Sequence, residues 1–257
     1  MLPSAPVHRD TIVDEFTRQS RSFNASPAMT SAATLQSLID FIPSAPDQDW
    51  LEVACGPGLI ARALAPRVRS VHGVDLTEAM VALASAEALR VGAANARFAL
   101  GDATHLDLPD ASYDGAVTRF SLHHIPLPGR CLAEMVRVVR PGGRVVLADG
   151  VASEDGAAMA WHQEIERLRD PSHWANLTAT RIRSLARAAG LEPVDERVLP
   201  LELDWAEWLE RGSGAAANRD LIAAALADRP EQSDCFRVAD GVLRTRYYLS
   251  RWHRPAR

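Results

Sequence analysis

The sequence contains no lysine, so all 28 of its basic residues are arginine. Lysine forms the Schiff bases of pyridoxal phosphate enzymes and of carbonyl-binding enzymes, and it is the P-loop residue that reaches nucleotide phosphates. Enzymes that depend on either chemistry are therefore excluded.

Other features are scarce as well. The three cysteines lie far apart, with no C-x-x-C pair and no histidine at zinc-ligand spacing, so we expect reduced thiols and no metal site. No apolar run approaches the ~18 residues of a membrane span, and the N-terminus lacks the pattern of an export signal. The net charge of −5 does not suit a nucleic-acid binder. We expect a cytoplasmic protein, monomeric or homodimeric, without a membrane span or a nucleic-acid partner.

The rest of the sequence predicts an α/β fold. A chain of 257 residues, 47% of them hydrophobic, can build one large domain with a full core. Two helices are predicted over residues 11–23 and 29–41, and strands and helices then alternate, which is typical of parallel strands joined by right-handed crossovers. The predicted strands are 50–55, 70–74, 96–100, 113–118 and 144–149, and the predicted helices between them are 59–64, 78–91 and 127–139.

The second half departs from this alternation. Pro141-Gly142-Gly143 is expected to turn the chain before the fifth strand, and a cap insertion is expected at about 151–190, before a strand at 191–194. Asp240-Gly241 between two β-prone runs predicts a hairpin and therefore an antiparallel last strand. The expected fold is a doubly wound, mostly parallel seven-stranded Rossmann-like sheet over 46–257, preceded by N-terminal helices in 1–45.

A glycine turn follows the first predicted strand, at Gly56-Pro57-Gly58. Glycine allows a tight turn and leaves room for a ligand, while the exposed N–H groups at the start of the next helix face that ligand. The pattern alone also fits a dinucleotide-binding turn, and a purely structural turn between strand and helix would need no ligand. Asp75 and Asp102, which end the second and third strands, suit ribose hydroxyls and an adenine edge. Either acid could instead cap the following helix.

These residues resemble the class I S-adenosylmethionine-dependent methyltransferases, and within them the small-molecule group related to ubiquinone and menaquinone biosynthesis methyltransferases. The resemblance covers roughly residues 16–191. It rests on four motifs: Leu51-Glu52-Val53-Ala54-Cys55-Gly56-Pro57-Gly58, Val74-Asp75-Leu76-Thr77-Glu78-Ala79-Met80, Gly101-Asp102-Ala103 and Arg140-Pro141-Gly142-Gly143.

The resemblance implies S-adenosylmethionine as the cofactor and assigns its contacts by position. Gly56 and Gly58 would contact the methionine part, Glu52 its ammonium, Asp75 the ribose and Asp102 the adenine edge. The N-terminal helices would form a lid, with Phe16, Arg21 and Phe23 facing the site. The implied cofactor-binding residues are Glu52, Ala54, Gly56, Pro57, Gly58, Asp75, Leu76, Met80, Gly101, Asp102, Ala103, Arg119 and Phe120.

Histidines are the candidate general bases, because imidazole has a suitable unperturbed pKa. His123 and His124 follow the fourth strand, at the edge where the transferred methyl group should lie, although both could be hydrogen-bonded structural residues. The aromatic composition of the expected cap suits a flat aromatic substrate, but simple packing is the alternative. The substrate-facing candidates are Phe23, Trp161, His162, His173 and Trp174.

The sequence therefore predicts an enzyme that methylates an O, N or C atom of a small, aromatic or quinone-like metabolite. A short-chain nicotinamide-dependent oxidoreductase would need a Tyr-x-x-x-Lys pair, which a chain without lysine cannot supply. A non-methylating relative, either a cyclase or a cofactor-binding protein, stays open because its cofactor site would look alike.

Overall fold

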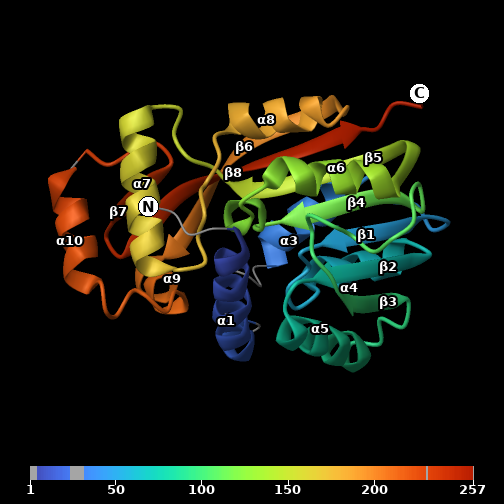
Figure 1. Ribbon diagram of the computed structural model, residues 1–257, viewed down its shortest axis with the longest axis horizontal. Coiled ribbons are helices and arrows are strands. Elements are labelled where there is room, and N and C mark those ends of the chain that lie inside the picture. Colours follow the sequence, from blue (N-terminus) through green and yellow to red (C-terminus); the bar gives the residue numbers. More distant parts are fainter. Residues whose placement is uncertain (1–4, 24–31, 230, 257) are drawn as a thin grey trace.

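The computed structural model describes residues 5–23, 32–229 and 231–256, which form an α/β protein built on one eight-stranded sheet (Figure 1). The strand order is β3-β2-β1-β4-β5-β8-β6, and β7 pairs with β8 outside this path. Strands β1 to β5 pair in parallel, whereas β8 is antiparallel to both β5 and β6. The strands are β1 (Asp49–Val53), β2 (Ser70–Asp75), β3 (Ala96–Leu100), β4 (Tyr113–Arg119), β5 (Val139–Gly150), β6 (Glu192–Asp204), β7 (Phe236–Ala239) and β8 (Val242–His253).

Helices cover both faces of the sheet and create two cores. One core joins the sheet to α6 and α8, and the other joins it to α3 and α4. No helix among the described residues is long and apolar enough to cross a bilayer. The helices are α1 (Ala5–Phe23), α3 (Ala32–Phe41), α4 (Leu59–Leu64), α5 (Glu78–Arg90), α6 (Pro128–Val138), α7 (Gly156–Arg169), α8 (Ala179–Ala188), α9 (Trp205–Arg211) and α10 (Arg219–Asp228), with short 3₁₀ turns η1 (Ala65–Arg67) and η2 (Leu122–His124).

Strand β1 lies inside the sheet, between β2 and β4, and shows why Trp50, Leu51 and Val53 are apolar. Successive side chains of a strand point to opposite faces of the sheet. Trp50 accordingly packs in the core with α3 and α4, while Leu51 and Val53 pack in the core with α6 and α8. Because both faces are covered by helices, neither face of β1 can be polar without a buried partner.

A third core lies beyond the edge of the sheet, in a unit that we call the cap: α7, α9, α10 and β7. Trp161 of α7, Trp208 of α9 and Ile222 of α10 pack there around Phe236 of β7. The sequence pointed to an insertion at 151–190 but missed the second segment, between β6 and β8. Helix α8, inside the expected insertion, instead packs beside α6 against the sheet. An amphipathic pattern reveals that a helix buries one face, not which element covers that face.

Two expected turns have different outcomes. The hairpin at Asp240-Gly241 is confirmed: β7 and β8 pair antiparallel, and the two turn residues have φ angles of 54° and 74°. The expected turn at Pro141-Gly142-Gly143 is wrong, because these residues lie within β5. The pairing of β4 with β5 shifts register there, so the glycines accommodate an irregular stretch of strand instead of ending it.

We predict that Gly115→Ala destabilises the fold. An added Cβ would lie 2.5–2.7 Å from three ring atoms of Trp50, whose side chain is fully buried and cannot move away. Such overpacking costs about 1–3 kcal/mol, which urea unfolding of the variant should reveal. Gly156→Ala is the matched control, because a Cβ at Gly156 meets nothing within 4 Å. Equal stability of the two variants would contradict this account of the β1–β4 packing.

Candidate functional site

A cavity of about 370 Å³ opens at the carboxyl ends of the parallel strands, which is where open α/β sheets bind their ligands. The loops after β1, β2, β3 and β4 form its walls, and α1 covers it through Arg9, Ile12 and Phe16. Figure 1 shows α1 lying between the cap and α5, across this edge of the sheet. The volume falls within the usual range of roughly 300–1,000 Å³ for small-molecule sites.

The glycine turn after β1 forms one wall, and its two glycines differ in what they allow. Gly56 lines the cavity with a φ of 49°, and a Cβ there would meet nothing within 4 Å, so it would project into open space. Gly58 has a φ of 72° and does not line the cavity; a Cβ there would lie 2.6 Å from the Phe98 ring. The missing side chain of Gly56 therefore leaves space for a ligand, whereas that of Gly58 leaves space for the ring of Phe98.

Asp75 ties the turn after β1 to the turn after β2. Its buried carboxylate accepts hydrogen bonds from the N–H of Gly56 at 2.7 Å and of Thr77 at 3.0 Å. Burial raises its pKa, although the two backbone donors oppose this shift. A carboxylate has about four acceptor positions, so hydroxyl groups of a ligand could still be accepted.

Asp102 stands on the opposite side, after β3, and lines the cavity together with Gly101 and Ala103. One of its oxygens accepts from the N–H and hydroxyl of Thr104, at 2.8 and 2.7 Å. The other lies 3.6 Å from the guanidinium of Arg9, on the covering helix. Asp102 therefore lines the cavity and also contacts α1, the helix that covers the cavity.

Glu52 and Arg119 are two buried ionisable residues that line the cavity. Burial raises the pKa of Glu52 to about 8, even though the Ala61 N–H, at 2.8 Å, and Arg119 favour its charged form. Burial also lowers the pKa of Arg119 to about 10, against the opposing influence of Glu52. The neighbouring residues Ala54 and Phe120 hold φ angles of 53° and 51°, which are strained for non-glycine residues and typical of functional sites.

The two candidate bases occupy different environments. His124 lines the cavity, and His123 does not. The Nδ1 of His123 lies 2.5 Å from a carboxylate oxygen of Asp149. Burial lowers the pKa of His123, but Asp149 outweighs it and the net shift is upward.

Four of the five substrate-facing candidates, Trp161, His162, His173 and Trp174, do not line the cavity. Trp161 packs in the core of the cap and donates its indole N–H to the carbonyl of Ala225 at 2.7 Å. His162 lies 3.3 Å from the side-chain amide of Asn176, and His173 lies 2.7 Å from that of Gln163. Trp174 packs edge-on against the ring of His8. The side chains of Arg21 and Phe23 are outside the described part of the chain.

The cavity brings together most of the expected cofactor residues, but Met80 and Gly58 do not line it. Met80 is fully buried in the core instead. Arg9 and Ile12 also line the cavity, although they were not predicted as site residues. Their spacing with Phe16 places all three on one face of α1. The spacing of these three residues in the sequence shows that they share one face of a helix, but it does not show what that face covers. The other lining residues that were not predicted are Cys55, Leu59, Ile60, Thr77, Thr104, Ser121, Ile125, Pro126 and Leu127.

The fold and the cavity together define a Rossmann-like α/β protein with its ligand site at the carboxyl edge of the sheet. Comparison with known proteins assigns it further. The methyltransferase-domain family matches residues 51–147. The methyltransferase YcgJ of Bacillus subtilis, of uncharacterized specificity, is 34% identical over 170 residues, which are 66% of this chain and 67% of YcgJ. The crystal structure of YcgJ aligns with a TM-score of 0.78 at 26% identity, over 87% of this chain and 98% of that one.

Two further relatives carry named acceptors. The demethylmenaquinone methyltransferase of Renibacterium salmoninarum is 31% identical, over 44% of this chain and 45% of its own length. The 27-O-demethylrifamycin SV methyltransferase of Amycolatopsis mediterranei is 31% identical, over 61% of this chain and 58% of its own length. The chain belongs to the class I S-adenosylmethionine-dependent methyltransferases, and its methyl donor is S-adenosylmethionine.

We predict that Glu52→Gln makes the ligand-free protein more stable at alkaline pH. The pKa of Glu52 is raised from 4.5 to about 8, so its contribution to stability is present below pH 4.5 and is lost as the pH rises through 8. At ~1.4 kcal/mol per pKa unit, the variant should gain roughly 2–5 kcal/mol over wild type between pH 5 and pH 8.5. Urea unfolding across this range measures the difference.

The exposed Glu164→Gln is the matched control for loss of a carboxylate. If Glu52→Gln and wild type keep a constant difference in unfolding free energy at every pH, the assignment to Glu52 is wrong.

Proposed function

We propose that this enzyme methylates an O, N or C atom of a small apolar metabolite of aromatic or quinone-like character. The observation that carries the proposal is the lining of the cavity beyond the glycine turn and the acidic strand ends. The lining includes the apolar residues Ile12, Phe16, Ile125 and Leu127 as well as His124, whose ring meets that of Phe16 edge-on. Such a lining favours a flat apolar body with one polar or protic atom.

The residues of the cavity fit the cofactor. The open space at Gly56 would receive its methionine part, with Glu52 beside the ammonium, and Asp75 would accept the ribose hydroxyl hydrogens. Asp102, with Gly101 and Ala103, would bind the adenine edge. Ala54, Pro57, Leu76, Arg119 and Phe120 would complete the contacts.

When bound, S-adenosylmethionine supplies an electrophilic methyl group on a positively charged sulfur. The chain itself mainly holds and encloses the reactants. Ile12 and Phe16 of α1 cover the cavity and limit access of water, and the loop from Ile125 to Leu127 forms the facing wall. An apolar acceptor held between these two walls would meet the methyl group in one orientation.

The acceptors named for two relatives support this class without selecting within it. One relative is named for demethylmenaquinone, a quinone, and the other for 27-O-demethylrifamycin SV. Both are small organic molecules, and they differ greatly in shape. The fold therefore accommodates different acceptors, and the residues that line the cavity decide between them.

We predict that Gly56→Ala weakens binding of S-adenosylhomocysteine by about tenfold or more, which corresponds to ~1.4 kcal/mol. The added Cβ would project into the cavity, where nothing now lies within 4 Å of it. Titration calorimetry measures the affinity. Gly142→Ala is the matched control: Gly142 also has a positive φ, of 84°, and also has open space around its Cβ position, but it lies outside the cavity. No binding to wild type would refute the cofactor assignment, and equal losses in both variants would refute the role of Gly56.

We also predict that the wild-type enzyme transfers a labelled methyl group to phenols or hydroquinones in preference to aliphatic amines and carboxylic acids. The physical reason is the apolar lining beside His124, which suits a flat ring and disfavours a charged acceptor. Mass spectrometry of products from a panel of these four compound classes measures the preference. Equal or better transfer to charged aliphatic compounds would contradict the proposed acceptor class.

A further inference from the structure

His123 and His124 are adjacent in sequence, but only His124 is free to serve an acceptor in the cavity. The ring of His123 is held at Nδ1 by Asp149, whose carboxylate also accepts from the N–H groups of Leu122 and Gly150. The ring of His124 lines the cavity. The two ring centroids are 4.2 Å apart, so the partners of one imidazole influence the other.

The hydrogen bonds of His124 fix which nitrogen carries its proton. Nδ1 lies 2.9 Å from the backbone carbonyl oxygen of Ser172, which can only accept, so Nδ1 is the protonated nitrogen. The hydroxyl oxygen of Ser172 lies 3.1 Å from the same nitrogen. Nε2 therefore carries the lone pair, and no hydrogen bond to it is found among the described residues. A neutral imidazole in this tautomer can accept a proton only at Nε2.

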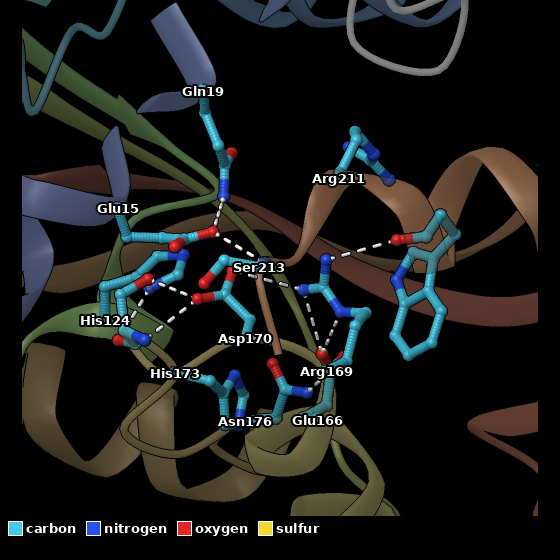
Figure 2. Close-up of polar contacts among 12 residues, drawn as sticks. Glu15, Gln19, His124, Glu166, Arg169, Asp170, His173, Asn176, Arg211 and Ser213 are labelled. Carbon is cyan, nitrogen blue, oxygen red and sulfur yellow. Dashed lines mark hydrogen bonds and ion pairs between the residues drawn. The ribbon is translucent and has the colours of Figure 1, made fainter. Parts of the chain in front are cut away.

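Asp170 holds Ser172 in place through two hydrogen bonds, and Figure 2 labels Asp170 and His124 in this cluster. One oxygen of Asp170 accepts from the N–H of Ser172 at 2.9 Å and from its hydroxyl at 2.6 Å. The other oxygen lies 3.4 Å from the guanidinium of Arg169. Burial raises the pKa of Asp170, but Arg169, His124 and Ser172 outweigh it and the net shift is downward, so the acid stays ionised.

Helix α1 holds His124 from the other side. Its His8 contacts the backbone oxygen of His124 through Nε2 at 3.0 Å, and the ring of Phe16 meets the His124 ring edge-on at a centroid distance of 4.9 Å. In Figure 2, Glu15 and Gln19 of the same helix lie beside this cluster. Two remote parts of the chain, α1 and the segment 170–172, thus restrain the position of His124.

The charge state of His124 agrees with this geometry. Burial, and after it the neighbouring His123, lower the pKa of His124 to about 4, against the opposing influence of Asp170. The ring is therefore neutral at neutral pH. A neutral ring keeps the Nε2 lone pair available.

We propose that Nε2 of His124 accepts the proton of a hydroxyl acceptor, and that Asp170 and Ser172 are the positioning residues that set its tautomer and orientation. This inference rests on the proposed function. In the reaction, the acceptor oxygen bonds to the methyl carbon as the carbon–sulfur bond breaks, and that electron pair stays on sulfur. The hydroxyl proton passes to Nε2, so the products are a methyl ether, neutral S-adenosylhomocysteine and the His124 imidazolium, which returns its proton to solvent.

The test uses NMR spectra of the full-length protein with ¹⁵N-labelled histidine, saturated with S-adenosylhomocysteine and titrated with phenol or hydroquinone. The His124 signals are identified by their loss in His124→Gln. We expect a protonated Nδ1 and an unprotonated Nε2, and we expect the Nε2 signal to shift when either phenolic probe is added. A protonated Nε2 in the free protein, or an Nε2 signal that responds to neither probe, overturns the proposal.

Variants of the two positioning residues separate orientation from folding. Ser172→Ala and Asp170→Asn should each weaken phenol binding about two- to tenfold, the net value of one hydrogen bond, and leave the affinity for S-adenosylhomocysteine unchanged. Ser250→Ala is the matched control, because Ser250 is equally buried and hydrogen-bonded, to Trp252, but lies elsewhere. Unchanged phenol binding in Ser172→Ala overturns the positioning role.

The outcomes also separate this inference from the proposed function. Failure of wild type to bind S-adenosylhomocysteine refutes the proposed function. Binding of S-adenosylhomocysteine without any response of His124 to the phenolic probes refutes only the role of His124.

Discussion

The buried carboxylate of Asp75 is the constraint on which the site depends. It accepts hydrogen bonds from the turns after two adjacent strands, through the N–H groups of Gly56 and Thr77, and so fixes the glycine turn relative to β2. A buried carboxylate without donors would be strongly unfavourable, whereas one with two backbone donors holds two loops in register. The cavity keeps its shape without a ligand because these loops cannot move independently.

Helix α1, which covers the cavity, is held in place by polar interactions as well as by apolar contacts. Arg9 of α1 reaches Asp102 on one wall, and Glu15 of α1 accepts from the backbone N–H of Ser213 beyond α9. Helix α1 therefore contacts both the sheet edge and the cap. In the proposed function, α1 and the loop after β4 form the substrate side of the cavity, so small changes in either would alter the acceptor without disturbing the cofactor side. This division is consistent with relatives that share the domain and differ in their named acceptors.

Much of the fold could be predicted from the sequence because the relevant signals are local. Residues 96–100 and 59–64 match the bounds of β3 and α4, since alternating apolar runs and punctuating glycines need no tertiary information. The irregular stretch at Gly142 and the second segment of the cap could not be predicted. Both depend on partners distant in sequence: β4 for the shifted register, and α7 for the helices between β6 and β8.

By itself, the sequence determined the order of strands and helices as far as β5, the glycine turn and the acids at the strand ends, and hence the cofactor class. Parallel strands bring such residues to one edge wherever the chain alternates β and α. Only the tertiary structure decided what meets that edge. It placed His124 in the cavity and bound His123 to Asp149, it packed Trp161 into the cap, and it brought Arg9 across to Asp102. Adjacent residues have the same sequence context, so only contacts between remote segments can give them different chemical roles.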